Sequence, residues 1–136
     1  MSAVGTSKML SSSYDLSWGP GDRVIYLRIR GVFGPEEAAV LNQQLTEWLN
    51  NAQTTASFIL AIDATDIATL TQFEQVRAVQ QYMFHPQLKY IFIATDNKLI
   101  RLSFMVMFNT APAYVRLFDN WPVLETYVRQ SLDSFP

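Results

Sequence analysis

Cysteine is absent from this chain of 136 residues, and histidine occurs once, as His85. Without cysteine there are no disulfides, thiolate nucleophiles or thiolate metal sites. One histidine cannot build the histidine clusters that hold zinc or iron within a single chain. We therefore expect no metal site, no cofactor and no triad of catalytic residues. His85 precedes Pro86 at a helix end, where a cation favours the negative end of the helix dipole, so we interpret it as a structural cap.

Charged residues are also scarce, at 16% of the chain against about 25% in typical domains. The net charge of −2 gives no electrostatic reason to bind nucleic acid or anionic lipid. Apolar runs such as "FMVMF" (104–108) are far too short to cross a bilayer, and residues 1–12 lack the apolar stretch of a signal peptide. We expect a cytoplasmic protein without a transmembrane segment, with some apolar surface reserved for a partner.

One domain over residues 13–136 is expected, after a flexible N-terminus at 1–12. Residues 13–18 and 23–31 alternate apolar and polar side chains around a "GPGD" turn, which predicts an antiparallel hairpin. Arg28 and Arg30 share one side of the second strand, where we interpret them as charges on a sheet edge.

Helices and strands then alternate along the chain. Helical spacing of apolar residues predicts helices at 34–52, 71–85, 97–112 and 119–132, and apolar runs predict strands at 57–63, 89–95 and 114–118. The order is ββαβαβαβα. It predicts an α/β fold with four helices on a mixed, mainly parallel sheet that begins with the hairpin.

The stretch "IDATDIATLTQFEQVR" (62–77) allows three interpretations. In the first, Asp63, Thr65 and Asp66 are the polar end of a strand that leads into a loop, and Thr71 forms a capping box with Glu74. In the second, Thr71 or Thr69 is a phosphorylation switch beside Asp63. In the third, Asp63 or Asp66 is the base of an enzyme, although nothing nearby supplies a nucleophile.

The helix at 97–111 is apolar on both sides. At 100° per residue we assign Leu99, Leu102, Ser103, Val106 and Met107 to the core, and the opposite side is then formed by Arg101, Phe104, Met105 and Phe108. Leaving such rings exposed forgoes about 1.5 to 3 kcal/mol of burial each. We expect a homodimer or another protein partner to cover them. A small apolar ligand or lipid, or the rest of the same subunit, are the alternatives.

The chain also resembles the STAS-like fold of sulfate-transporter and anti-sigma-factor-antagonist domains and of small bacterial proteins related to them. The resemblance covers residues 13–132. It lies in the element order, in the apolar strand that ends at Asp63 before a threonine-rich segment, and in the C-terminal pattern "KYIFIAT…VRLFDNWPVLETYV".

This resemblance implies a non-catalytic regulatory domain that binds partner proteins, sometimes under phosphorylation control. Some relatives bind nucleotides or lipids. In phosphorylated members a serine near the start of the following helix carries the phosphate, and Thr71 is the residue nearest that position here. Leu70, Gln72 and Phe73 depart from the Asp and small residues of that motif.

Overall fold

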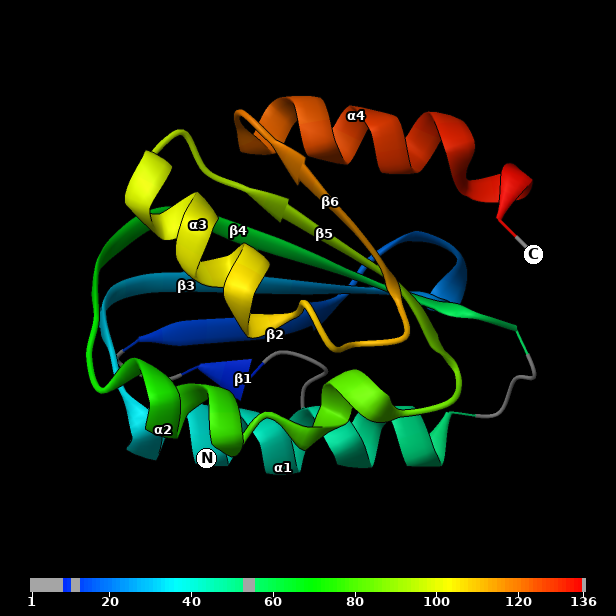
Figure 1. The fold of residues 1–136 in the computed structure, drawn as a ribbon. Coiled ribbons are helices and arrows are strands. Elements are labelled where there is room, and N and C mark those ends of the chain that lie inside the picture. The colour runs from blue at the N-terminus through cyan, green and yellow to red at the C-terminus, as the bar shows by residue number, and fades with distance from the viewer. Residues whose placement is uncertain (1–8, 11–12, 53–55, 136) are drawn as a thin grey trace.

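The structure is a computed structural model that describes residues 9–10, 13–52 and 56–135. Its six-stranded sheet has the strands side by side in sequence order (Figure 1). They are β1 (Met9–Leu10), β2 (Tyr14–Trp18), β3 (Val24–Phe33), β4 (Phe58–Leu70), β5 (Leu88–Ala94) and β6 (Tyr114–Phe118). β1, β2 and β3 pair antiparallel, and the pairs from β3 to β6 are parallel. The predicted hairpin and mixed, mainly parallel sheet are confirmed.

β1 belongs to the segment 1–12 that was expected to be flexible. Met9 lies opposite Leu16 and Leu10 opposite Asp15, so these two residues add a short strand to the edge of the hairpin. The rest of that segment lies outside the described residues.

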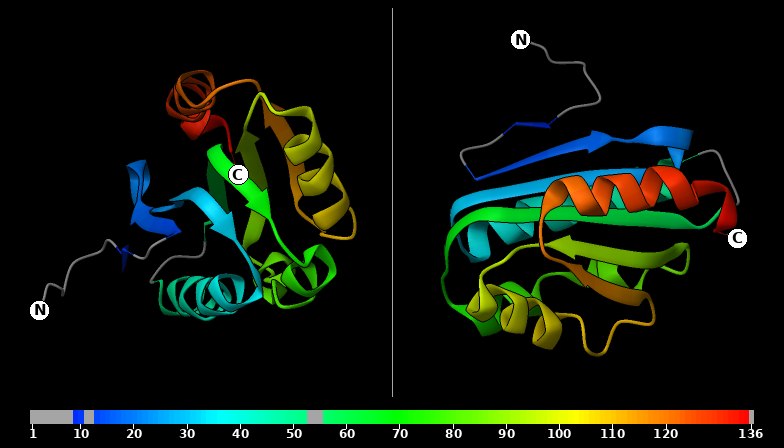
Figure 2. Two further views of the ribbon diagram at one scale, coloured as in Figure 1. Left: turned by 90° about the vertical axis from the view of Figure 1, so that its left-hand side faces the viewer. Right: turned by 90° about the horizontal axis from the view of Figure 1, so that it is seen from above.

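Helices cover both faces of the sheet (Figure 2). The first face carries α1 (Pro35–Asn51), α2 (Phe73–Ala78) and α3 (Lys98–Met107), and the second carries α4 (Trp121–Ser131). The parallel strands β3 to β6 follow one another across the sheet in sequence order. Right-handed crossovers between strands in such an order place every connecting helix on the same face. α4 follows the last strand, so it connects no pair of strands, and it covers the opposite face of the sheet. Short 3₁₀ helices occur at η1 (Pro20–Asp22), η2 (Gln81–Phe84) and η3 (Leu132–Ser134).

A hydrophobic cluster lies on each side of the sheet. The larger one fills the space beneath α1, α2 and α3, and the smaller one lies beneath α4. Because successive residues of a strand point to opposite faces, β4 contributes Leu60 and Ile62 to the first cluster and Ile59 and Ala61 to the second. This double burial explains the continuous apolar run at 57–63.

Asparagine side chains fix the starts of two helices. Asn97 Oδ1 accepts hydrogen bonds from the N–H groups of Leu99 at 2.9 Å and Ile100 at 3.1 Å, and Asn120 Oδ1 accepts one from Val123 N–H at 3.0 Å. These contacts satisfy N–H groups that have no partner inside the helix. α3 and α4 therefore begin where the sequence predicts. Within the described residues, every helix is too short or too polar to cross a membrane.

β4 continues through the threonine-rich stretch that was expected to be a loop. Residues 64–70 extend the parallel pairing with β3, which places Arg30 opposite Asp66 and Phe33 opposite Leu70. The pairing of β4 with β5 ends earlier, where Asp63 lies opposite Ala94. The predicted loop is wrong, because threonine and isoleucine favour strands and β3 runs alongside them as far as Phe33, with two irregularities in the register.

α2 does not begin with the predicted capping box. Its N-cap is Gln72, in the left-handed conformation at φ 51°, and no side chain caps the helix. Thr71 N–H donates instead to Phe33 O at 3.1 Å, which continues the strand pairing by one residue. The prediction that Thr71 caps this helix is therefore wrong. The single helix predicted at 71–85 is divided into α2, which ends at Ala78, and η2. The apolar side chains of this segment still pack in the main core, at Phe73, Val76, Val79 and Met83.

β3 lies inside the sheet, so the prediction that Arg28 and Arg30 mark an edge strand is wrong. Each arginine pairs with an aspartate of a neighbouring strand. Arg28 Nη2 lies 2.5 Å from Asp66 Oδ2 on β4, and Arg30 Nη1 lies 2.7 Å from Asp15 Oδ2 on β2. The partner carboxylates are far away in the sequence, which is why alternation alone suggested solvent-facing charges.

Candidate functional site

α3 buries one apolar face and exposes another. Its buried side chains recur at positions i, i+4, i+7 and i+8, namely Ile100, Phe104, Met107 and Phe108. The Phe104 and Phe108 rings stack with centroids 6.1 Å apart, and Phe108 also meets Tyr82 edge to face at 6.5 Å. These contacts place both phenylalanines in the main core of the subunit.

The predicted outward orientation of Phe104 and Phe108 is wrong, since each ring is only 2% exposed. Leu99, Leu102 and Val106, which were assigned to the core, point outward instead. Both faces of the helix are apolar, so the hydrophobic pattern did not distinguish them. Burying the larger rings removes more apolar area from water. The stripe from Ile100 to Phe108 was the sequence signal that could have identified the core side.

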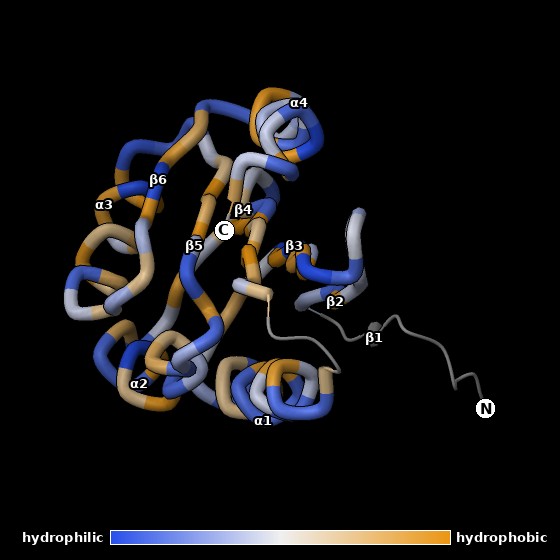
Figure 3. Tube along the Cα trace, turned by 90° about the vertical axis from the view of Figure 1, so that its right-hand side faces the viewer, coloured by the Kyte–Doolittle hydropathy of each residue, from blue (hydrophilic) through white to orange (hydrophobic). Residues whose placement is uncertain are grey.

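The outward face of α3 remains strongly apolar. We call it the α3 surface and define it by Leu99, Leu102, Met105 and Val106, with exposed fractions of 71, 60, 46 and 39%. Figure 3 colours most of this helix as hydrophobic. A surface helix ordinarily presents polar side chains to water. The predicted interface residue Met105 is therefore exposed, and three residues missed by the sequence prediction share its face.

Arg101, another predicted interface residue, joins α3 to the ends of two strands. Its Nη1 donates to Thr95 O at 3.0 Å and Phe118 O at 3.4 Å, and it forms an ion pair with Asp119 Oδ1 at 3.1 Å. The carbonyls lie just beyond β5 and at the end of β6. This arrangement gives Arg101 a structural role and leaves the apolar side chains as the binding feature of α3.

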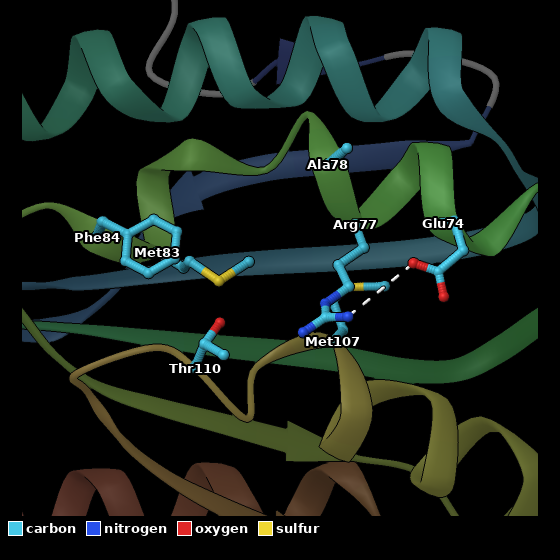
Figure 4. A pocket seen from close by; sticks show the side chains of 7 residues that line it. All are labelled: Glu74, Arg77, Ala78, Met83, Phe84, Met107 and Thr110. Atoms are coloured by element: carbon cyan, nitrogen blue, oxygen red, sulfur yellow. Dashed lines mark ion pairs between the residues drawn. The ribbon is translucent and has the colours of Figure 1, made fainter.

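A groove lies at the C-terminal end of α3, where it meets α2 and η2 (Figure 4). It encloses about 280 Å³ between Arg77 of α2, Met83 and Phe84 of η2, and Met107 of α3. Arg77 Nη2 donates to Asn109 Oδ1 at 3.0 Å, which ties α2 to the end of α3. Phe84 is half exposed at the groove. The α3 surface and this groove form the candidate binding site.

The two aspartates of the 62–77 stretch lie on β4 and are engaged by different partners. Asp63 Oδ1 accepts from Thr65 Oγ1 at 2.5 Å and from Thr65 N–H at 3.2 Å. Asp66 is paired with Arg28. Within the described residues, aspartate, glutamate and histidine side chains form no group of three that could hold a metal ion.

Thr71 and Thr69, the candidate phosphorylation residues, lie at the end of β4. Thr69 is exposed, and Thr71 lies against the start of α1, in a shallow cavity lined by Gly34, Glu36 and Glu37. α2 has six residues and a left-handed N-cap, so it offers Thr71 no regular helix terminus. The two glutamates would repel a phosphate placed there. The phosphorylation switch stays a prediction, and its surroundings do not favour it.

His85 ends η2 and holds the following turn. Gln87 N–H donates to His85 Nδ1 at 3.1 Å, and His85 Nε2 lies 2.8 Å from Asn50 Oδ1 on α1. Accepting at Nδ1 leaves the ring neutral with its proton on Nε2. Burial lowers the pKa of His85 from its ordinary value. These contacts support the structural interpretation of His85, through hydrogen bonds of the neutral ring.

The chain was compared with protein families, curated proteins and solved structures. No family model matches the sequence, and no curated protein matches it. The structure is similar to the crystal structure of an uncharacterized protein from the DUF3478 family with a SpoIIAA-like fold, from Shewanella loihica PV-4. The TM-score is 0.59 at 16% identity, over 94% of this chain and 99% of that one. The predicted STAS-like fold is confirmed, and at this identity the likeness concerns the fold alone.

Proposed function

We propose that this protein is a non-catalytic regulatory domain that binds another protein through the α3 surface and the adjoining groove. The partner is a protein segment, such as an amphipathic helix, that lays an apolar face along α3 and inserts one side chain beside Phe84. The single observation that carries the proposal is the set of four exposed apolar side chains on α3. The STAS-like fold is consistent with such a role.

α3 could have been amphipathic at no cost to the core. Its inner face already supplies Ile100, Phe104, Met107 and Phe108 to the packing. Fully burying an apolar side chain is worth roughly 1.5 to 3 kcal/mol, and the residues of the α3 surface, which are 39 to 71% exposed, can still gain a corresponding part of it. Contiguous exposed apolar residues of this kind mark sites of interaction.

The size of the surface favours a transient partner over an obligate homodimer. α3 has ten residues, so it is about 15 Å long. One helix face of that length is smaller than the roughly 800 Å² per partner that stable interfaces bury. Even with the groove added, a second copy of this chain docked on α3 would associate weakly.

The groove is better suited to a side chain than to a lipid. Its volume of about 280 Å³ falls below the roughly 300 to 1,000 Å³ of pockets that enclose drug-sized ligands. Arg77 and Glu74 also line it, with their charged ends 4.0 Å apart. We therefore favour a protein partner over the small apolar ligand considered from the sequence.

The proposal is tested by site-specific photocrosslinking in cells that produce the protein. A crosslinking amino acid replaces Leu102 on α3 in one variant and Val123 on α4 in a matched control. Both positions are exposed apolar residues on helices, at 60 and 52%. We expect a discrete protein adduct from position 102 and none from position 123.

The adduct's protein is then identified and its binding measured by calorimetry with the purified components. Leu102→Glu should weaken binding at least tenfold, whereas Val123→Glu should leave it unchanged. Crosslinks between copies of this chain would identify the occupant as a second copy. Equal adducts from both positions, or unchanged affinity in Leu102→Glu, would overturn the proposal.

A further inference from the structure

The second face of the sheet is only partly covered by its helix. α4 packs over β4, β5 and β6, and β2 lies to one side of it (Figure 2). Among the described residues, the cluster beneath α4 includes Val24 and Tyr26 of β3 and no residue of β2, so the side chains of β2 on this face lie beyond the edge of α4. A cavity of about 300 Å³ lies there, remote from the α3 surface on the other side of the sheet.

Strand register explains what lines this cavity. Asp15, Arg28 and Asp63 form one row across β2, β3 and β4, with Asp15 opposite Arg28 and Arg28 opposite Asp63. Ser17 and Tyr26 lie opposite each other in the next row of that face. Trp121, the first residue of α4, closes one side. We call this space the sheet cavity.

The two arginines near the sheet cavity already have carboxylate partners. Arg28 Nη2 donates to Asp66 Oδ2 at 2.5 Å. Arg30 donates to both oxygens of Asp15, at 2.7 and 3.3 Å, in the two-point geometry that holds a carboxylate firmly. Neither guanidinium is left to attract an anion into the cavity.

Asp63 differs from the other carboxylates of this group. Both of its hydrogen bonds arrive at Oδ1 and come from Thr65, a neutral residue. Among the described residues no cation forms an ion pair with it. With Asp15, Asp66 and the two arginines, the group carries three negative and two positive charges, so its net charge is −1. Asp15 and Asp63 both line the cavity. Arg28 lies opposite Asp63 and interacts with it electrostatically, and Asp63 is the one carboxylate of this group that has no ion pair of its own.

Aromatic rings form the other part of the lining. Tyr26 and Trp121 meet edge to face, with centroids 5.1 Å apart and planes at 83°. The faces of such rings attract cations, tryptophan most strongly. A carboxylate without an ion pair beside an aromatic corner is the combination that recognises an ammonium group attached to an apolar body.

We propose that the sheet cavity binds a small organic ammonium ion, whose N–H groups donate to Asp63 while its apolar part packs against Trp121 and Tyr26. The volume, at the low end of ligand pockets, limits the ligand to one ring or a short chain. This site is independent of the protein-binding surface proposed on α3, so either proposal can fail alone.

The test compares two probes of matched shape and opposite charge, phenethylamine and 3-phenylpropionate. Each is titrated into the ¹⁵N-labelled full chain and followed by NMR. We expect phenethylamine to shift the Trp121 indole N–H and the Asp63 amide signals in a saturable way. The carboxylate probe should leave both signals in place.

Two variants and a control locate the site. Asp63→Asn keeps the acceptor for Thr65 and removes the charge, and it should weaken phenethylamine binding at least tenfold. Trp121→Leu should weaken it several-fold with Asp63 intact. Asp96→Asn changes an exposed aspartate beyond β5 and should bind like the wild type. Absence of shifts in the wild type, equal shifts with the anion, or unchanged affinity in Asp63→Asn would overturn the proposal.

Discussion

Gly34 and Thr71 lie so close together that a Cβ on Gly34 would be 2.7 Å from Thr71 Oγ1. Gly34 is the N-cap of α1, and Thr71 follows the last residue of β4. The contact therefore joins the start of the longest helix to the end of the longest strand. The reason for glycine at this position is steric and not conformational, because any residue can adopt its φ of −126°.

Gly34→Ala should therefore destabilise the protein by about 1 to 3 kcal/mol, the usual cost of overpacking. Thr71→Ala removes the clashing oxygen, so the double variant should recover most of the loss. Urea unfolding of the four proteins measures the coupling between the two positions. Gly31→Ala is the control: Gly31 has φ 66° with open space around it, so its strain should be unaffected by Thr71→Ala.

A negative charge at Thr71 should also destabilise the protein. The first turn of α1 places Glu36 and Glu37 beside the same cavity, and like charges repel at this range. Thr71→Glu should be less stable than the neutral isostere Thr71→Gln by roughly 0.5 kcal/mol, and the gap should shrink in high salt. If Thr71→Glu proves at least as stable, the site tolerates the charge that a phosphorylation switch requires.

Arg101 should contribute far more to stability than its visible ion pair suggests. Asp119 is 87% exposed, and an exposed pair is worth about 0 to 1 kcal/mol. The Thr95 carbonyl also accepts from this guanidinium at 3.0 Å, and losing the partner of such a group costs about 1 to 3 kcal/mol. The Phe118 carbonyl would keep the Thr95 N–H as a donor. Thermal unfolding should show a clear loss for Arg101→Met and almost none for Asp119→Asn. Equal effects would contradict this structural role.

The element order was predictable because each segment carries a local signal. Apolar spacing marked the helices, and Asn97 and Asn120 lie where helix starts are expected. Alternation in residues 13–31 marked the hairpin. These signals act within a few residues along the chain, so they can be recognised without knowing which segments meet.

Long-range pairing could not be predicted in the same way. Arg28 and Asp66 are 38 residues apart, and only the register of β3 on β4 brings them together. The same register turns the polar residues after Asp63 into a strand, although their composition is typical of a loop. The sheet cavity is likewise absent from the sequence pattern, because β2, β3, β4 and α4 each supply part of it.

Substitutions on the two faces of α3 should differ in their effect on stability. Phe104 is buried against Phe108, so Phe104→Ala should cost about 3 to 5 kcal/mol of stability. Leu102 is exposed, and Leu102→Ala should stay within about 0.5 kcal/mol of the wild type. Chemical denaturation distinguishes the two. A mild effect of Phe104→Ala would indicate that this ring is exposed, as was expected from the sequence.

His85 should make stability fall as the pH is lowered below neutrality. Burial depresses its pKa in the folded protein, and protonating Nδ1 would turn the acceptor of the Gln87 N–H into a second donor. Because the unfolded chain, with an ordinary pKa near 6.5, takes up this proton first, the stabilising contribution is complete above about pH 6.5. It is lost as the pH falls towards the lower folded pKa.

His85 is the only histidine, so the difference between wild type and His85→Asn isolates this effect. Asparagine does not titrate, and its side-chain oxygen can accept the Gln87 N–H in place of Nδ1. Urea midpoints measured from pH 7.5 to 5.5 should fall for the wild type and stay nearly level for His85→Asn. A parallel decline in both proteins would assign the pH dependence to carboxylates, and a wild type that gains stability on acidification would mean that the folded state holds the imidazolium.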